Sequence, residues 1–301
     1  MNLLVTGAWD AREDAIKELE AMGHTVCFLQ FERDELPCDY EWVQGVICNG
    51  LFLYHDISLF KNLKFIQLTS AGFDRVPMDY VKANNIEIYN ARGVYSIPIA
   101  EFVLSGVLDL YKKSRFFSEN QTAHIWKKNR DLQELFGKTV CIVGAGSVGS
   151  ECAKRFSAFG TTVLAVDIAK PTDSVYDNYF PLESIGEAIK ISDVIVLTLP
   201  LTDQTKGMFR ESLLSHFKPN AILVNVARGA IVNQNDLIDA LQTEKIFGAV
   251  LDVFETEPLN ADSPLWDMEN VIITPHNSFV GEGNSDRLKC VILNHLERSN
   301  L

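Results

Sequence analysis

Short apolar runs of strand length alternate with helix-like stretches along almost the whole chain. The runs are rich in Val, Ile and Leu and nearly continuous, as in strands that are covered on both faces. Strands that alternate with helices form parallel sheets, so the pattern predicts an α/β fold. The predicted strands form two sets: Leu3–Thr6, Thr25–Leu29, Gly45–Cys48, Phe65–Leu68 and Ile86–Tyr89, then Thr139–Val143, Thr162–Val166, Val194–Leu199, Ala221–Val226, Gly248–Val253 and Val271–Thr274.

A long helical stretch separates the two sets of strands. It begins near Ser96, has Pro98 in its first turn, and continues through IAEFVLSGVLDLYKKSRFFSENQ. Ser and Pro are typical of a helix start. The apolar residues of this helix suit a core, a subunit interface or both. With 301 residues, the chain is long enough for about two domains.

Composition and charge exclude several classes of partner. The formal net charge of −13 repels phosphate backbones, so we expect no nucleic-acid partner. It also repels small anions, so an anionic substrate requires a local positive site. No run approaches the roughly 18 apolar residues of a membrane span, and the start MNLLVTGAWD does not resemble a signal peptide. The six cysteines are scattered without a CxxC pair, which predicts no metal site and favours a reducing, cytoplasmic location.

The segment TVCIVGAGSVG (139–149) places three glycines directly after a predicted strand: Gly144, Gly146 and Gly149. A helix is predicted to follow at 150–159, closed by Gly160. In a dinucleotide-binding loop, the first glycine permits the tight turn and the second lets the pyrophosphate approach the backbone. The third lets helix and strand pack closely. The helix N-terminus offers free amides and a positive dipole end to the phosphates.

Asp167 follows the next predicted strand, 18 residues beyond Gly149. A carboxylate there accepts hydrogen bonds from the ribose hydroxyls and repels a 2′-phosphate, so NAD is predicted over NADP. Lys170 weakens that preference. Alternatively, Asp167 is only a turn residue after a strand.

Polar residues also follow the later strands of the second set. LTLPLTDQT ends its strand at Pro200, Arg228 follows 221–226, Glu257 comes shortly after 248–253, and His276 follows 271–274. The carboxyl ends of parallel strands lie along one edge, where open α/β sheets bind ligands. Together the three charged or basic residues suit hydride chemistry: His276 moves the hydroxyl proton, Glu257 holds the imidazole, and Arg228 grips a carboxylate. Considered one at a time, each residue has an alternative role. His276 suits a structural role, Arg228 suits an ion pair with a protein carboxylate, and Glu257 suits a position in a solvated loop.

The segments GAGSVG, LPLTDQT, NVARG, LDVFETEP and TPHNS, in this order, resemble the D-isomer-specific 2-hydroxyacid dehydrogenase family. TSAGFD, NARG and IAE in the first half resemble it as well. The resemblance implies catalytic roles for Arg228, Glu257 and His276. It implies substrate contacts from Ser70, Ala71, Gly72 and Arg228. It implies cofactor contacts from Gly144, Gly146, Ser147, Val148, Gly149, Asp167, Thr198, Leu199, Pro200, Thr205, Val226, Ala227, Arg228, Asp252, His276 and Ser278.

The resemblance also implies two Rossmann-like, doubly wound domains with a cleft between them. The substrate domain is expected at 1–97 plus 277–301 and the NAD-binding domain at 98–276. It further implies a homodimer formed through the helix near 99–118, and a small 2-keto or 2-hydroxy acid as substrate. Arg92 stands where many members have a small or apolar residue, and is a candidate second anion anchor; alternatively, it is a surface residue paired with Glu101 or with solvent. Trp126 is a candidate for lining a partner's pocket.

Two other functions fit the same motifs. A dinucleotide-sensing, corepressor-like binding protein uses the same fold and keeps the Arg–Glu–His set, although this sequence shows no long disordered flank. A formate or phosphite dehydrogenase relative requires pocket residues of its own, and no clear sign of them is visible.

Overall fold

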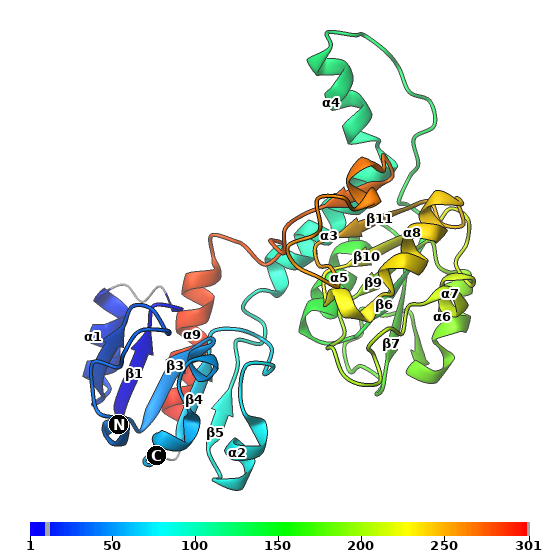
Figure 1. The fold of residues 1–301 in the computed structure, drawn as a ribbon. Helices are drawn as coiled ribbons and strands as arrows, with labels where there is room; N and C mark the ends of the chain where they lie inside the picture. Colours follow the sequence, from blue (N-terminus) through cyan, green and yellow to red (C-terminus); the bar gives the residue numbers. More distant parts are fainter. Residues whose placement is uncertain (10–12, 300–301) are drawn as a thin grey trace. The chain divides into compact units, whose positions relative to one another are not determined.

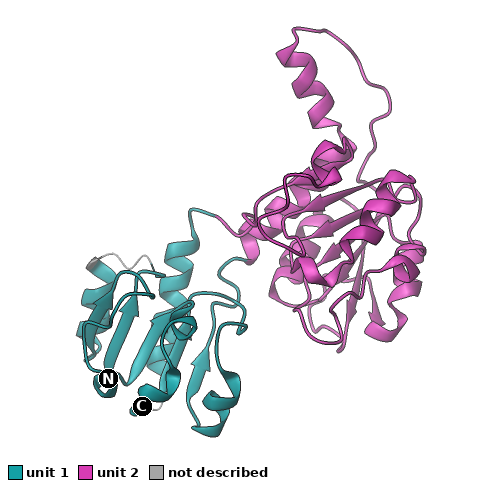
Figure 2. Cartoon of the chain, viewed as in Figure 1, with its two compact units in different colours: residues 1–95, 281–301 teal, residues 96–280 magenta. Residues whose placement is uncertain are grey.

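The computed structural model describes residues 1–9 and 13–299 and divides the chain into two compact units. Unit 1 comprises residues 1–95 and 281–301, and unit 2 comprises residues 96–280 (Figures 1 and 2). Each unit is an α/β body built on its own parallel sheet. The predicted fold class, with two parallel-sheet α/β bodies, is confirmed.

Unit 1 has a five-stranded sheet in the order β2-β1-β3-β4-β5, with every pair parallel. Its strands are β1 (Asn2–Thr6), β2 (Thr25–Leu29), β3 (Gly45–Cys48), β4 (Phe65–Leu68) and β5 (Glu87–Tyr89). Its α-helices are α1 (Glu13–Ala21), α2 (Met78–Ala83) and α9 (Asn284–Arg298), and its 3₁₀ turns are Tyr40–Trp42, Leu51–Leu53 and Ile57–Leu59. The C-terminal helix α9 returns to this unit and packs through Leu288, Ile292 and Leu296.

Unit 2 has a seven-stranded parallel sheet in the order β12-β11-β10-β9-β6-β7-β8. Its strands are β6 (Thr139–Val143), β7 (Thr162–Asp167), β8 (Asn178–Pro181), β9 (Val194–Leu197), β10 (Ile222–Asn225), β11 (Gly248–Leu251) and β12 (Val271–Ile273). Its α-helices are α3 (Ser96–Tyr111), α4 (Ser114–Thr122), α5 (Ser147–Ala158), α6 (Ile185–Ile191), α7 (Glu211–Leu214) and α8 (Gln234–Gln242). Three 3₁₀ turns complete it: Leu182–Ser184, Gly229–Ile231 and Pro264–Asp267.

Both faces of the unit 2 sheet are covered, as the continuous apolar runs predict. Alternate residues of one strand enter different core clusters: Cys141 and Val143 of β6 join one cluster, while Val140 and Ile142 join the other. All four are fully buried. Strand residues alternate between the two faces of a sheet, so a strand buried on both sides needs an unbroken apolar run.

Two sequence predictions about secondary structure were wrong. Strand β8 was missed because its sequence, NYFP, carries no apolar run; it lies at the sheet edge, where Pro181 is tolerated. The long helix predicted from Ser96 is broken after Tyr111, and α4 begins at Ser114. Lys113 lies at the break and has a positive φ of 51°, a left-handed conformation that interrupts an α-helix.

α4 and the segment that follows it, residues 123–134, are called the arm here. The arm projects from the body of unit 2 (Figure 1). It exposes apolar side chains, above all Trp126, whose surface is 96% accessible.

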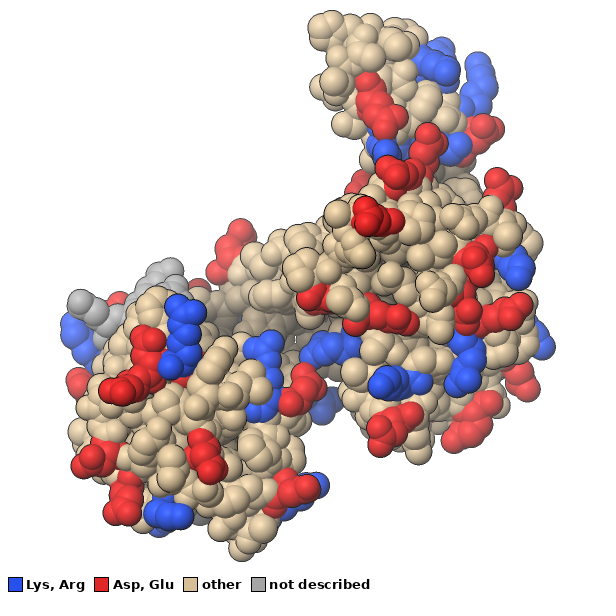
Figure 3. All heavy atoms as spheres, viewed as in Figure 1, with Lys and Arg blue, Asp and Glu red and all other residues tan. Residues whose placement is uncertain are grey.

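Charged side chains are spread over the surfaces of both units. Acidic groups appear on many elements in the face shown in Figure 3, in line with 40 acidic against 27 basic residues in the chain. In the described part of the chain, no helix is both long and apolar enough to cross a membrane, and no cluster of three or more potential metal ligands occurs.

Candidate active site

The strand order of unit 2 reverses between β6 and β9, and the glycine loop lies there. Open α/β sheets bind ligands at this kind of switch point, beyond the carboxyl ends of the strands. Gly144 turns the chain out of β6 with a φ of 102°, which favours glycine. A Cβ on Gly144 would also overlap the backbone of Thr198 and Leu199. The Thr198 hydroxyl donates to the Gly144 carbonyl over 2.6 Å, which fixes the loop to β9.

Helix α5 starts at Ser147, three residues earlier than predicted, with Gly146 as its N-cap residue. A Cβ built on Gly146 meets no atom within 4 Å, so the space over this residue is open. A Cβ on Gly149 would overlap the carbonyl oxygen of Gly144, so only glycine allows this close packing of helix on strand. Open space in front of a helix N-terminus fits the pyrophosphate of a dinucleotide.

Asp167 ends β7, beside the glycine loop. One carboxylate oxygen accepts from the Ala145 amide over 2.7 Å, and the other accepts from the Ile168 amide over 2.7 Å. The side chain is only partly buried. The carboxylate therefore holds the glycine loop and stays within reach of a ligand at the same strand end.

The other predicted cofactor residues of unit 2 lie along the carboxyl edge or just behind it. Thr205 is buried, and its hydroxyl donates to the Pro200 carbonyl over 2.7 Å, so it holds the 200–205 loop together. The Ser147 hydroxyl lies 2.9 Å from that of Ser96. Leu199, Ala227 and Ser278 are buried, whereas Pro200 is exposed, and Val148 and Val226 are half-buried.

Arg228 leaves the end of β10 in a tightly held turn. The side chain of Asn225, which is 1% exposed, accepts from the Ala227 amide over 3.1 Å and donates to the Arg228 carbonyl over 3.1 Å. A Cβ on Gly229 would overlap the Phe254 backbone, so this turn packs directly on the segment that follows β11. The half-buried Arg228 side chain donates from Nη1 to the Ala227 carbonyl over 2.8 Å. Asn225 is a positioning residue that the sequence analysis did not identify.

His276 and Glu257 form a hydrogen-bonded pair at the same edge. Nδ1 of His276 lies 2.9 Å from Oε2 of Glu257, and the side chains are 42% and 38% exposed. Oε1 of Glu257 accepts from the Phe254 amide over 3.1 Å, which orients the carboxylate. His276 has a positive φ of 52°, unusual for a residue with a side chain. Because Nδ1 is engaged, Nε2 is the ring nitrogen left for a ligand.

Asp252 anchors the loop that carries His276. Its carboxylate is fully buried. One oxygen accepts from the Thr274 hydroxyl over 2.6 Å and the Asn277 amide over 2.7 Å, and the other accepts from the Ser278 amide over 3.0 Å. The His276 amide donates to the Asp252 carbonyl over 2.8 Å. Several charge-assisted bonds onto one carboxylate hold a short loop in one conformation.

The predicted substrate residues Ser70, Ala71 and Gly72 lie in unit 1, in the loop after β4. Within the described residues, none of their three amides donates a hydrogen bond. The loop is held instead through its carbonyls: the Ala91 amide donates to Ser70 over 2.9 Å, and the Asn90 side chain donates to Ala71 over 2.6 Å. Three unused amides in a fixed loop suit an anion.

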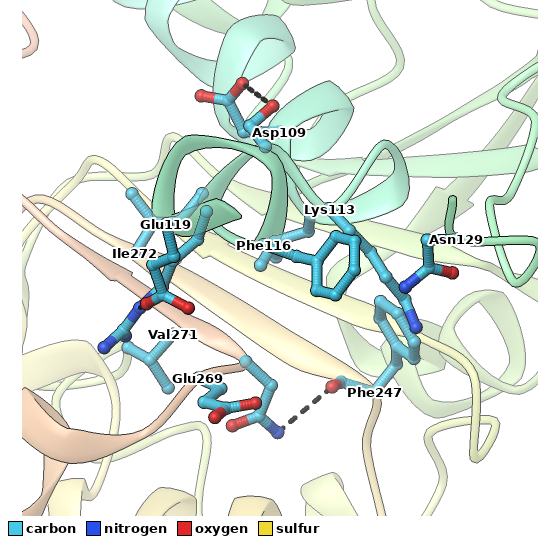
Figure 4. Close-up of a pocket in the computed structure, with 13 residues that line it drawn as sticks. Asp109, Lys113, Phe116, Glu119, Asn129, Phe247, Glu269, Val271 and Ile272 are labelled. Atoms are coloured by element: carbon cyan, nitrogen blue, oxygen red, sulfur yellow. Dashed lines mark hydrogen bonds and ion pairs between the residues drawn. The ribbon is translucent and has the colours of Figure 1, made fainter. Parts of the chain in front are cut away.

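Unit 2 thus brings together Arg228, Glu257 and His276 at the ends of three neighbouring strands, β10, β11 and β12. The glycine loop and Asp167 follow β6 and β7 of the same sheet. A separate hollow of about 560 Å³ lies under the arm, between α3, α4 and the edge strand β12. Figure 4 shows its lining, which includes Phe116 and Phe247 and none of the predicted catalytic residues.

Comparison with known proteins gives consistent matches. The family model for the D-isomer specific 2-hydroxyacid dehydrogenase NAD binding domain matches residues 104–278. A hydroxypyruvate reductase of Blautia hydrogenotrophica is 31% identical over 245 residues, covering 78% of this chain and 75% of that protein.

Two solved structures are also similar. A D-isomer specific 2-hydroxyacid dehydrogenase from Xanthobacter autotrophicus, in complex with NADPH and MES, matches with a TM-score of 0.80 and 27% identity over 98% of this chain and 94% of that one. A D-lactate dehydrogenase from Aquifex aeolicus, complexed with NAD and lactic acid, matches with a TM-score of 0.78 and 25% identity, again over 98% and 94%.

Proposed function

This chain belongs to the D-isomer specific 2-hydroxyacid dehydrogenase family, and we propose that it transfers hydride between NAD(H) and C2 of a small 2-keto or D-2-hydroxy acid. The observation that carries the proposal is the hydrogen bond of 2.9 Å between His276 and Glu257 at the carboxyl edge of the sheet. We further propose that unit 2 binds the cofactor and unit 1 the substrate.

In the reduction direction, Nε2 of His276 gives a proton to the C2 oxygen as C2 receives hydride. A reduced nicotinamide cofactor held by unit 2 would supply that hydride. Glu257 holds the ring through Nδ1, which leaves Nε2 as the nitrogen that moves the proton. In the oxidation direction, the same nitrogen takes the hydroxyl proton.

In unit 2, Arg228 would bind the substrate carboxylate. In unit 1, the unused amides of Ser70, Ala71 and Gly72 also suit an anionic group. A guanidinium can hold a carboxylate through two parallel hydrogen bonds, which orients the neighbouring carbonyl toward the hydride. Asn225 supports this role by fixing the turn that carries Arg228. Asp252 supports the role of His276 by fixing its loop.

We propose that the cofactor is NAD and that NADP is less favoured. The carboxylate of Asp167 at the end of β7 suits ribose hydroxyls and repels a 2′-phosphate. The similar Xanthobacter protein is complexed with NADPH, whereas the similar Aquifex protein is complexed with NAD, so both nucleotides occur in complexes of this fold.

We propose that the protein is a cytoplasmic homodimer whose arm contacts the partner. Trp126 is 96% exposed and Ile125 is 54% exposed, and apolar side chains gathered on a projecting arm are typical of a covered surface. Sedimentation velocity tests the dimer, and Trp126→Ser is expected to weaken it.

The deciding experiment is a screen of 2-keto acids with NADH and NADPH, followed by the loss of reduced-cofactor absorbance. For any active substrate, His276→Ala is expected to lower turnover roughly 10²–10⁴-fold while NADH still binds. No turnover of any 2-keto acid by the native protein, together with tight dinucleotide binding, would favour a sensing protein instead. A near-native rate for His276→Ala would overturn the assignment of the proton-transferring residue.

A further inference from the structure

Arg92 lies in a turn that is joined directly to the 70–72 loop of unit 1. The residues on its N-terminal side make both connections: Ala91 bonds to Ser70 over 2.9 Å, and Asn90 bonds to Ala71 over 2.6 Å. Arg92 therefore directly follows Asn90 and Ala91, the two residues that hold the loop with the three unused amides. Its side chain is exposed.

The turn that carries Arg92 is rigid. The Val94 amide donates to the Ala91 carbonyl over 3.1 Å, and Gly93 has a φ of 91°, as glycine has at the third position of a type II turn. The Arg92 amide donates to Oδ1 of Asn90 over 3.2 Å. Arg287 of α9 donates to the Val94 carbonyl over 2.7 Å, which ties the turn to the C-terminal helix. Arg92 thus extends from the corner of a preorganised turn.

Arg92 is a cation at the surface of unit 1. The alternative partner considered from the sequence, Glu101, pairs with Arg155 over 3.1 Å. Among the described residues of unit 1, no carboxylate forms an ion pair with Arg92. A cation with no ion pair in the described part of its own unit is available to an external anion, and it supplies the local positive charge that an anionic ligand requires on a chain with a net charge of −13.

We propose that Arg92 is a specificity-determining residue that binds a second acidic group of the substrate. The substrate class is then a 2-keto acid whose side chain ends in a carboxylate or a comparable anion. This inference rests on the proposed function, because the amides of residues 70–72 hold the first carboxylate. A guanidinium matches a planar carboxylate through two hydrogen bonds, and it offsets the repulsion that the acidic surface exerts on a dianion.

The test compares matched substrates on the purified protein. Oxaloacetate, 2-oxoglutarate and 2-oxoadipate are each measured against the monocarboxylic 2-keto acid of the same chain length, with NADH and with NADPH. The native protein is expected to show a higher kcat/KM for at least one diacid than for its monoacid. Arg92→Gln is expected to lower kcat/KM for that diacid roughly ten- to hundredfold, the effect of one lost charge-assisted interaction. The monoacid value is expected to stay within about threefold, because its only carboxylate is held elsewhere.

Lys82→Gln is the matched control. Lys82 is an exposed cation in the last turn of α2, which precedes the amino end of β5, whereas Arg92 follows the carboxyl end. The control removes the same charge from the same unit at the opposite end of the sheet. It is expected to leave the diacid-to-monoacid ratio unchanged.

The outcomes separate the two proposals. A native protein that reduces monoacids without preferring any diacid overturns the role of Arg92 and leaves the proposed function standing. An equal loss for both members of a pair in Arg92→Gln also overturns it, since Arg92 then acts on the shared carboxylate or on folding. No reduction of any 2-keto acid with either cofactor overturns both.

Discussion

Thr274→Val tests whether the buried carboxylate of Asp252 holds the loop of His276 in place. The substitution keeps the shape of the side chain and removes the hydroxyl that donates to Asp252 over 2.6 Å. A hydrogen bond to a charged group contributes about 1.5–3 kcal/mol. For a body of about 150–250 residues, such as unit 2, each kcal/mol corresponds to about 2–4 °C in Tm. The expected loss is therefore roughly 3–12 °C.

The same change is expected to lower kcat. The 274–278 loop loses one of its three hydrogen bonds to the Asp252 carboxylate. His276 therefore spends less time in the position in which it bonds to Glu257. Calorimetry measures the Tm, and steady-state kinetics on the best 2-keto acid measure kcat. Thr243→Val is the control, because the exposed Thr243 hydroxyl donates only to the uncharged Asp239 carbonyl. Native Tm and native kcat in Thr274→Val would refute the role of Asp252 as the anchor of this loop.

Four further predictions follow from other contacts. Glu257→Gln should lower kcat for reduction, because the His276 ring loses the carboxylate that holds it through Nδ1; a native kcat would contradict the pair's role. Asp167→Ser should narrow the preference for NADH over NADPH, measured as the ratio of kcat/KM, although its lost bond to the glycine loop should also weaken NADH binding. Arg228→Lys keeps the charge but loses the bidentate geometry, so kcat/KM for the keto acid should fall roughly tenfold or more with Tm nearly native. Burial, with the nearby Arg298 charge, lowers the pKa of His295 below its ordinary value of 6.5, so stability should fall as pH drops through that value. His295→Gln should flatten this part of the stability curve, measured by Tm against pH.

Local sequence was enough to predict most of the fold. Continuous apolar runs predicted eleven of the twelve strands, because a strand buried on both faces must be apolar throughout. The glycine spacing predicted the loop after β6, since φ of 102° at Gly144 and the contact of Gly149 with Gly144 depend on the absence of a side chain. Asn233, a residue type typical of N-caps, precedes α8, and its side chain accepts from the Asp236 amide over 3.0 Å.

Tertiary structure decided what a short window of sequence does not contain. β8 is a strand because β7 offers its edge as a partner, and the half-exposed NYFP segment has no apolar run of its own. The helical path is interrupted at Lys113, which has a positive φ, although neither glycine nor proline stands there. The bonds from Asp252 to residues 274–278 and from Asn90 to Ala71 join groups that are 19 or more residues apart, so only folding brings them together. Sequence thus indicated which side chains are candidates for the chemistry, and the fold decided which buried polar groups hold them in position.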